Sequence, residues 1–188
     1  MLLRFAAISV AICAFAALLA ASTPSGVWLD VPFVKQEKEG CGAASIAMVM
    51  QYWQLQQGKP GAKVEPAADA VQIQRLLYTR DAHGIYAADL ERYFRQNRYN
   101  TFAFRGEVAD LRNHLAKGRP LIVALKPAGA GTDLHYVVVT GLDWQANVVM
   151  VNDPAQRKLL KQNQTDFERQ WSAAGRWTLL ALPQPDPH

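Results

Sequence analysis

The stretch Gln36–Trp53, QEKEGCGAASIAMVMQYW, decides how this sequence folds. Its first five residues are polar and typical of a loop, whereas small and apolar residues crowd together from Cys41 onward. Apolar side chains then recur at spacings of three and four, which predicts a buried helix that begins at Cys41. These side chains are Ile46, Val49, Met50 and Trp53. The glycines and proline of QQGKPG, residues 56–61, end the helix.

The sequence after this helix divides into a helical half and a β-rich half. Amphipathic spacing predicts helices over residues 71–78, 86–97 and 107–117, and a strand over 101–104. β-Branched runs then predict strands over residues 121–125, 136–140, 148–151 and 177–182. Residues 27–34 alternate around a proline, which indicates an edge strand or an extended arm. Helices followed by strands with short connections predict an α+β domain with an antiparallel sheet.

The first 22 residues have the composition of an export signal. Arg4 precedes an apolar run over residues 5–19, and Ala20-Ala21-Ser22 provides the small residues of a cleavage site. The run is shorter than the roughly 20 residues of a membrane span, although an uncleaved membrane anchor stays open as an alternative. We therefore expect a signal peptide over 1–22, a single domain over 27–183, and export to the periplasm or the extracellular space.

Charge and motif content exclude several kinds of function. Twenty basic against sixteen acidic residues give a net charge of +4, but no block of consecutive Lys or Arg stands out. The sequence therefore predicts no nucleic acid binding. No His, Cys and Asp residues have metal-ligand spacing and no glycine-rich phosphate loop is present, so we expect neither a metal nor a cofactor.

Cys41 is the first candidate for chemistry. The chain has two cysteines, and cleavage of the signal would remove Cys13 and leave one thiol. A single unpaired cysteine is unusual in an exported protein and suggests a reactive one. A helix N-terminus favours a thiolate, and Gly40 and Gly42 would let a substrate backbone approach closely. A buried, inert cysteine would fit the same pattern, so both interpretations stay open.

A thiolate nucleophile needs a base, and the base needs an orienting partner. Among the four histidines, His135 stands at the start of the apolar strand run 136–140. Asp153 follows the next strand run, 148–151. If these two strands form a hairpin, the start of one and the end of the other are neighbours, which would bring His135 and Asp153 together at one edge of the sheet.

Three segments carry a family resemblance. Residues 36–53, HYVVVTGLD at 135–143 and VNDPA at 151–155 resemble, in this order, the Cys, His and Asp motifs of the bacteriocin-leader (double-glycine) peptidase family, a branch of the papain-like cysteine proteases. The similarity spans about residues 27–183. It implies a papain-like fold, in which the helix that carries the nucleophile packs on an antiparallel sheet that carries His and Asp.

The resemblance also implies the site residues and their roles. Cys41 would be the nucleophile, His135 the general base and then acid, and Asp153 the residue that orients His135. Gln36 would donate to the oxyanion together with the backbone N–H of Cys41.

We therefore expect an exported cysteine peptidase that hydrolyses a peptide or protein substrate, with a leader peptide as one candidate. Leader-processing members are usually fused to an ABC transporter on the cytoplasmic side, whereas this sequence shows an export signal, so the resemblance indicates the chemistry rather than the substrate. Two alternatives stay open. The same thioester chemistry could serve an acyltransferase or transpeptidase, and the fold could be a catalytically silent peptide-binding module.

Overall fold

The computed structural model describes residues 25–58, 65–129 and 133–185. The expected signal peptide and its cleavage site lie outside these ranges. Within them, no helix combines the length and the apolar character that crossing a membrane requires.

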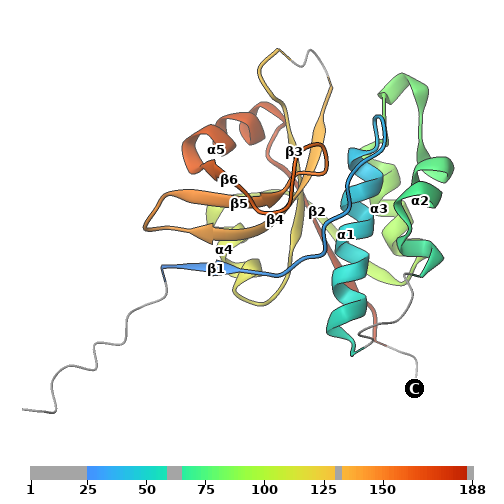
Figure 1. Cartoon of the computed structure of the whole chain (residues 1–188), viewed down its shortest axis with the longest axis horizontal. Coiled ribbons are helices and arrows are strands. Elements are labelled where there is room, and N and C mark those ends of the chain that lie inside the picture. Colours follow the sequence, from blue (N-terminus) through green and yellow to red (C-terminus); the bar gives the residue numbers. More distant parts are fainter. Residues whose placement is uncertain (1–24, 59–64, 130–132, 186–188) are drawn as a thin grey trace, which may run out of the picture.

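The helices and strands follow one another in the order seen along the colour ramp of Figure 1. The α-helices are α1 (Cys41–Gln56), α2 (Ala70–Leu77), α3 (Ala87–Gln96), α4 (Val108–Leu115) and α5 (Gln164–Ala173), with short 3-10 helices at Pro66–Ala68 and Arg80–Ala82. The strands are β1 (Gly26–Trp28), β2 (Tyr99–Arg105), β3 (Leu121–Leu125), β4 (His135–Asp143), β5 (Val148–Asn152), β6 (Leu160–Asn163) and β7 (Trp177–Pro183).

The strands form one antiparallel sheet with the order β2-β7-β3-β4-β5-β6, and β1 pairs with β4. Strands β4 and β5 are the hairpin that the sequence predicted, with Val138 opposite Asn152. This register brings the start of β4 close to the residue that follows β5. The predicted α+β class and its antiparallel sheet are confirmed.

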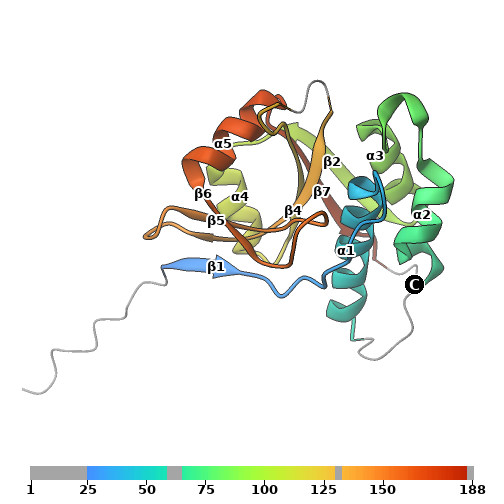
Figure 2. The ribbon, with the colours of Figure 1, turned by 45° about the horizontal axis from the view of Figure 1, so that its top comes forward.

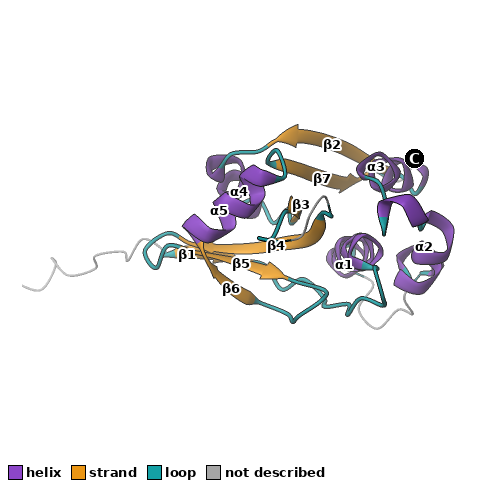
Figure 3. Cartoon of the chain, turned by 90° about the horizontal axis from the view of Figure 1, so that it is seen from above, coloured by secondary structure: helices purple, strands orange, loops and turns teal. Residues whose placement is uncertain are grey.

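Helices cover both sides of the sheet. Helices α1, α2 and α3 lie on one side, whereas α4 and α5 lie on the other (Figure 3). The strand β3, LIVAL, is buried at every position, because alternate side chains point into two different cores. Burial on both faces explains why this segment is a continuous apolar run rather than an alternating one.

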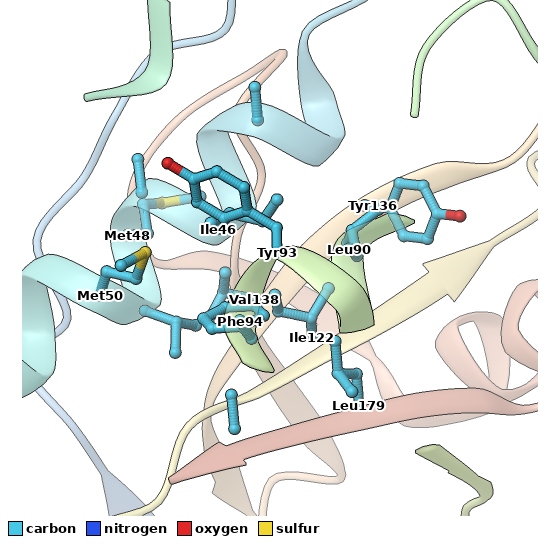
Figure 4. Close-up of a cluster of buried hydrophobic side chains, with 14 of the residues drawn as sticks. Ile46, Met48, Met50, Leu90, Tyr93, Phe94, Ile122, Tyr136, Val138 and Leu179 are labelled. Carbon is cyan, nitrogen blue, oxygen red and sulfur yellow. The ribbon is translucent and has the colours of Figure 1, made fainter. Parts of the chain in front are cut away.

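The first core lies between the sheet and helices α1 to α3. Figure 4 shows Ile46 and Met48 of α1 near Phe94 of α3 and near the strand residue Val138. Ile46 is fully buried, and truncation of such a side chain to alanine costs about 2–5 kcal/mol. This core fixes the position of α1 on the sheet, and therefore that of Cys41 at its start.

The second core contains the aromatic residues Phe167 and Trp171 of α5, both fully buried. Helix α5 and strand β6 were not among the predicted elements. Asn163 begins the helix, since its side chain accepts a hydrogen bond from the Thr165 backbone N–H at 2.9 Å. Asn163 is thus the N-cap of α5, and Gln164 and Thr165 are the first two residues of this helix.

Candidate active site

Cys41 is the first residue of α1, and its side chain is partly exposed. The helix begins with the hydrogen bond from Ala44 N to Gly40 O, 2.9 Å long. The N–H groups of a first helical turn have no acceptor within the helix, so they are free to stabilise negative charge near the Cys41 sulfur.

The glycines beside Cys41 are explained by packing within the protein. Both Gly40 and Gly42 are buried. A Cβ on Gly40 would lie 3.0 Å from Glu37 O, and one on Gly42 would lie 3.2 Å from the Ile85 side chain. These glycines therefore allow the loop and α1 to pack closely.

His135 and Asp153 are hydrogen-bonded partners. His135 Nε2 lies 2.8 Å from Asp153 Oδ1, and the carboxylate is almost completely buried, with a side-chain exposure of 3%. The Cys41 side chain is also close enough to this imidazole to contribute to its raised pKa. Because Nε2 is bound to Asp153, Nδ1 is the ring nitrogen that remains for the thiol.

The surroundings of His135 favour its charged form. Burial lowers the pKa of the ring, but the hydrogen bonds and negative charges of Asp153 and Cys41 outweigh burial and raise this pKa from 6.5 to about 9. Burial raises the pKa of Asp153, whereas its hydrogen-bond partners lower it. The hydrogen bond and charge of His135 outweigh burial and hold the pKa of Asp153 below its ordinary value of 3.8. An imidazolium beside a carboxylate is thus the favoured pair.

Two further donors hold the Asp153 carboxylate. The backbone N–H of Ala155 donates to Oδ1 at 3.0 Å, and the side chain of Gln156 donates to Oδ2 through Nε2 at 2.6 Å. Both contribute to the lowered pKa of Asp153. Gln156 was not among the predicted site residues, although its position three residues after Asp153 in a tight turn is a signal for such a contact.

Gln36 lies on an extended arm that crosses from β1 to α1 (Figure 2). Its backbone N–H donates to Pro154 O at 3.0 Å, which attaches the arm to the turn that carries Asp153. The Gln36 side-chain oxygen is buried and has no hydrogen-bond partner among the residues described here. The structure thus places Gln36 beside the turn that carries Asp153. Along the sequence, Gln36 stands five positions before Cys41.

Asn152, which was not among the predicted site residues, strengthens the attachment of the Gln36 arm to the Asp153 turn. Its side chain is fully buried. Nδ2 donates to Val31 O at 3.1 Å and to Pro32 O at 3.3 Å, while Oδ1 accepts from Leu159 N at 3.0 Å. A single buried amide therefore joins the arm of Gln36 to the end of β5. A polar residue at the end of an apolar strand was the available signal.

A second network holds the loop immediately before Cys41. Glu39 has a left-handed backbone with φ of 55°, and its carboxylate accepts a hydrogen bond from Tyr78 Oη. The other carboxylate oxygen lies 3.4 Å from His83 Nδ1. Gln74 donates through Nε2 to Lys38 O and Glu39 O. These contacts attach the loop to α2 and to the 3-10 turn that follows it.

A pocket of about 320 Å³ opens beside Cys41. Besides Cys41, the segment 81–87 and the residues Asp133, Leu134 and Tyr136 line it. The nucleophile candidate therefore borders a cavity that could accept part of a bound molecule. His83, which follows the 3-10 helix Arg80–Ala82, is among the lining residues.

The β4–β5 hairpin brings His135 and Asp153 together, as the hairpin argument anticipated, while Cys41 reaches them from the start of α1 and Gln36 lies on the adjoining arm. Asp143 lies at the other end of β4, where its carboxylate accepts from the backbone N–H groups of Gln145 and Ala146. No group of three or more His, Cys, Asp or Glu side chains that could hold a metal ion occurs within residues 25–58, 65–129 and 133–185.

Solved structures with the same fold are peptidase domains. A protein from Bacillus anthracis described as a C39-like peptidase superposes with a TM-score of 0.65 at 18% identity, covering 86% of this chain and 99% of that one. The peptidase domain of Streptococcus ComA, a bifunctional ABC transporter of a quorum-sensing pathway, gives a TM-score of 0.62 at 20% identity, with 81% and 98% covered.

A third neighbour is a double glycine motif protease from an AMS/PCAT transporter, solved in complex with the leader peptide. It superposes with a TM-score of 0.56 at 22% identity and covers 84% of this chain and 95% of that one. At these identities the similarity shows the fold alone. No curated protein has significant sequence similarity to the chain.

The sequence itself matches a family model. The model of the Peptidase_C39 like family matches residues 28–179, which begin at the end of β1 and extend into β7. This match covers most of the chain and includes Gln36, Cys41, His135 and Asp153, so the resemblance expected from the three motifs is confirmed. The chain belongs to the Peptidase_C39 like family.

Proposed function

We propose that this protein is an exported cysteine peptidase that hydrolyses a peptide bond with Cys41 as nucleophile, His135 as acid and base, and Asp153 as the residue that orients His135. The observation that carries the proposal is the position of His135. Its ring is hydrogen-bonded to a buried carboxylate through Nε2, and it interacts electrostatically with a thiol at a helix N-terminus.

The acylation step starts from the thiolate–imidazolium pair. The Cys41 sulfur attacks the carbonyl carbon of the scissile bond, and the carbonyl oxygen becomes an oxyanion. His135 then gives its proton to the leaving amine nitrogen as the C–N bond breaks. The products of this step are the free amine and a thioester between Cys41 and the acyl half of the substrate.

The deacylation step returns the enzyme to its starting state. Neutral His135 takes a proton from water while the water oxygen attacks the thioester carbon. The C–S bond breaks, the carboxylic acid is released, and the proton on His135 regenerates the pair with the Cys41 thiolate. Asp153 stabilises the imidazolium in both steps by its charge and by fixing the ring orientation.

The oxyanion would be bound by two neutral donors. The backbone N–H of Cys41 belongs to the first helical turn and has no intrahelical acceptor. The second donor would be the side-chain amide of Gln36. What supports this role is the position of Gln36 on the arm that is attached to the Asp153 turn, together with the family resemblance. An amide can donate to an oxyanion without neutralising the thiolate.

The substrate class follows from the family and the pocket. A peptide is the expected substrate, and the neighbour that was solved with a leader peptide supports a leader as one candidate. Export remains part of the proposal and is supported by the composition of residues 1–22.

Incubation with a peptide library tests the function. The protein is incubated with the library, and the products are mapped by mass spectrometry with and without an added amine. We expect hydrolysed products with new carboxyl termini that disappear with Cys41→Ala. Cleavage that persists in Cys41→Ala would refute a thiol mechanism. Products joined to the added amine would instead support the acyltransferase alternative.

The Cys41→Ala variant is also expected to fold normally. The side chain is partly exposed and small, so its removal should change the midpoint of thermal unfolding by only a few degrees. A circular dichroism melt checks this. Loss of activity with a normal melt would assign the defect to chemistry rather than to unfolding.

A further inference from the structure

The pocket beside Cys41 has an apolar wall. Ile85 and Tyr136 are each only 4% exposed and form the buried part of the lining, while Leu134 and Tyr86 are exposed at its edge. A volume of about 320 Å³ is at the lower end of the range of about 300–1,000 Å³ for small-molecule pockets. The space therefore suits one extended side chain of a bound peptide.

Two carboxylates line the pocket. Asp81 and Asp133 are both exposed, His83 is the basic residue in the lining, and no Lys or Arg belongs to the lining as described. Neither carboxylate has a side-chain partner among the described residues. The chain as a whole carries a net charge of +4, so two carboxylates near the nucleophile, neither paired within the part of the chain that the structure describes, run against its overall balance.

The 3-10 turn that carries Asp81 is attached to the loop immediately before Cys41. His83 lies 3.4 Å from the Glu39 carboxylate, which also accepts from Tyr78. Thr79 and Gly84 form an isolated antiparallel bridge, with 2.8 Å from Thr79 N to Gly84 O. The 3-10 turn Arg80–Ala82 between them is thus held in position, so Asp81 is presented from a defined turn.

We propose that this pocket selects a lysine or arginine side chain of the substrate, within about two residues of the cleaved bond. The inference rests on the proposed peptidase function. The aliphatic stem of such a side chain would pack against Ile85, Leu134 and Tyr136, and its charged head would reach Asp81 and Asp133. Cys41 lines the same pocket, which limits the occupant to residues close to the scissile carbonyl.

Matched peptides provide the test. A peptide cleaved in the library is made in three forms that differ at one position, with lysine, the neutral and similarly shaped norleucine, or glutamate, and this position is moved across the two residues on each side of the bond. At one position we expect kcat/KM to be about tenfold higher for lysine than for norleucine, and lowest for glutamate. The lysine preference should shrink in 1 M NaCl, because exposed charges are screened.

Variants assign this preference to the two carboxylates. In the double variant Asp81→Asn/Asp133→Asn, the ratio of kcat/KM for lysine over norleucine should fall to about one. Asp166→Asn is the matched control, because this exposed carboxylate lies on α5 and pairs with Arg169. Equal rates for lysine and norleucine at every position, or a ratio that the double variant leaves unchanged, would overturn the proposal.

A binding measurement separates this inference from the proposed function. The Kd of the Cys41→Ala variant for fluorescent forms of the lysine and norleucine peptides is measured by anisotropy. Tighter binding of lysine that depends on Asp81 and Asp133 would support the pocket even if cleavage persisted in Cys41→Ala, in which case only the proposed thiol mechanism fails. Cleavage without any preference for lysine would refute the pocket and leave the peptidase proposal intact.

Discussion

His135 and Asp153 are separated by 18 positions in the sequence, yet Nε2 of the histidine lies 2.8 Å from Oδ1 of the aspartate. The register of β4 and β5 produces this contact, because Val138 is opposite Asn152 and Asp153 follows directly. The carboxylate is buried and held by two other donors, so it can keep the ring in one orientation.

The first prediction concerns the pH dependence of activity. The pKa of His135 is raised to about 9, so the proton that the leaving amine requires remains on the ring at neutral pH. We expect kcat/KM to fall as the pH rises through about 9, measured with a fluorogenic peptide between pH 5 and 10. A fall centred near pH 6.5, the ordinary histidine value, would contradict the effect assigned to Asp153.

Stability should change in the same pH range and with a defined sign. A pKa that is higher in the folded than in the unfolded chain means that the folded state binds the proton more tightly. The contribution of charged His135 to stability is therefore fully present below about pH 6.5 and is lost as the pH rises through about 9. The matching measurement is the urea midpoint at pH 6 and pH 10, with and without His135→Ala.

The second prediction separates Asp153 from Asp143. Asp153→Asn removes the negative charge beside His135 but keeps the size of the side chain. In a Ser-His-Asp triad, the equivalent change lowers kcat by about 10⁴-fold, whereas papain-like sites use Asn as the orienting residue. We expect a smaller loss than for Cys41→Ala or His135→Ala, slower alkylation of Cys41 at neutral pH, and an alkaline fall shifted from about 9 toward 6.5.

Asp143→Asn is the control for this experiment. Its Oδ1 accepts from two backbone N–H groups of the turn after β4, and an amide oxygen can do the same. We expect no change in the rate of hydrolysis or of alkylation. A damaging Asp143→Asn together with a silent Asp153→Asn would require another residue to orient His135.

The sequence predicted those helices and strands whose apolar periodicity coincides with burial in the fold. The helical spacing after Cys41 predicted α1, and the two apolar runs predicted the β4–β5 hairpin that joins His135 to Asp153. In each case local apolar pattern and tertiary burial agree, so the pattern is visible without knowledge of the fold.

Other parts of the fold and of the site depend on contacts between distant segments. Strand β6, LKQN, is mostly polar and forms because it pairs with β5 at the edge of the sheet. Asn152 acts through carbonyl groups more than 100 positions earlier, and Glu39 through side chains on α2 and beyond. Neither relationship leaves a periodic signal in the sequence, and both required the structure.

The third prediction tests the proposed oxyanion donor. Gln36→Ala removes the side-chain amide but retains the backbone hydrogen bond to Pro154 O that fixes the arm. Loss of one oxyanion donor should lower kcat by about 10²-fold, with a smaller change in KM. Gln145→Ala is the control, because Gln145 is exposed in the turn after β4. An unchanged kcat for Gln36→Ala would make Gln36 an ordinary arm residue.

The last prediction concerns Gln156, which we interpret as a positioning residue. Its Nε2 donates to Asp153 Oδ2 at 2.6 Å, and this hydrogen bond helps to hold the pKa of Asp153 below 3.8. Gln156→Ala would leave Oδ1 with His135 and Ala155 but free Oδ2 to rotate. We expect kcat to fall by less than about tenfold, since Gln156 itself is exposed and its contact is partly replaced by water.

The pH profile then distinguishes positioning from a general loss of stability. Asp153 stays ionised near pH 9 in either case, but a carboxylate that can rotate holds its hydrogen bond to His135 less well. The alkaline fall of Gln156→Ala should therefore move below about pH 9, but less far than in Asp153→Asn. Gln164→Ala is a matched control, because Gln164 donates to the Glu168 carboxylate at 2.9 Å on α5. It removes an equivalent glutamine–carboxylate hydrogen bond, so it should leave the profile unchanged. If both variants shift the profile equally, the effect is not specific to Asp153 and Gln156 has no positioning role.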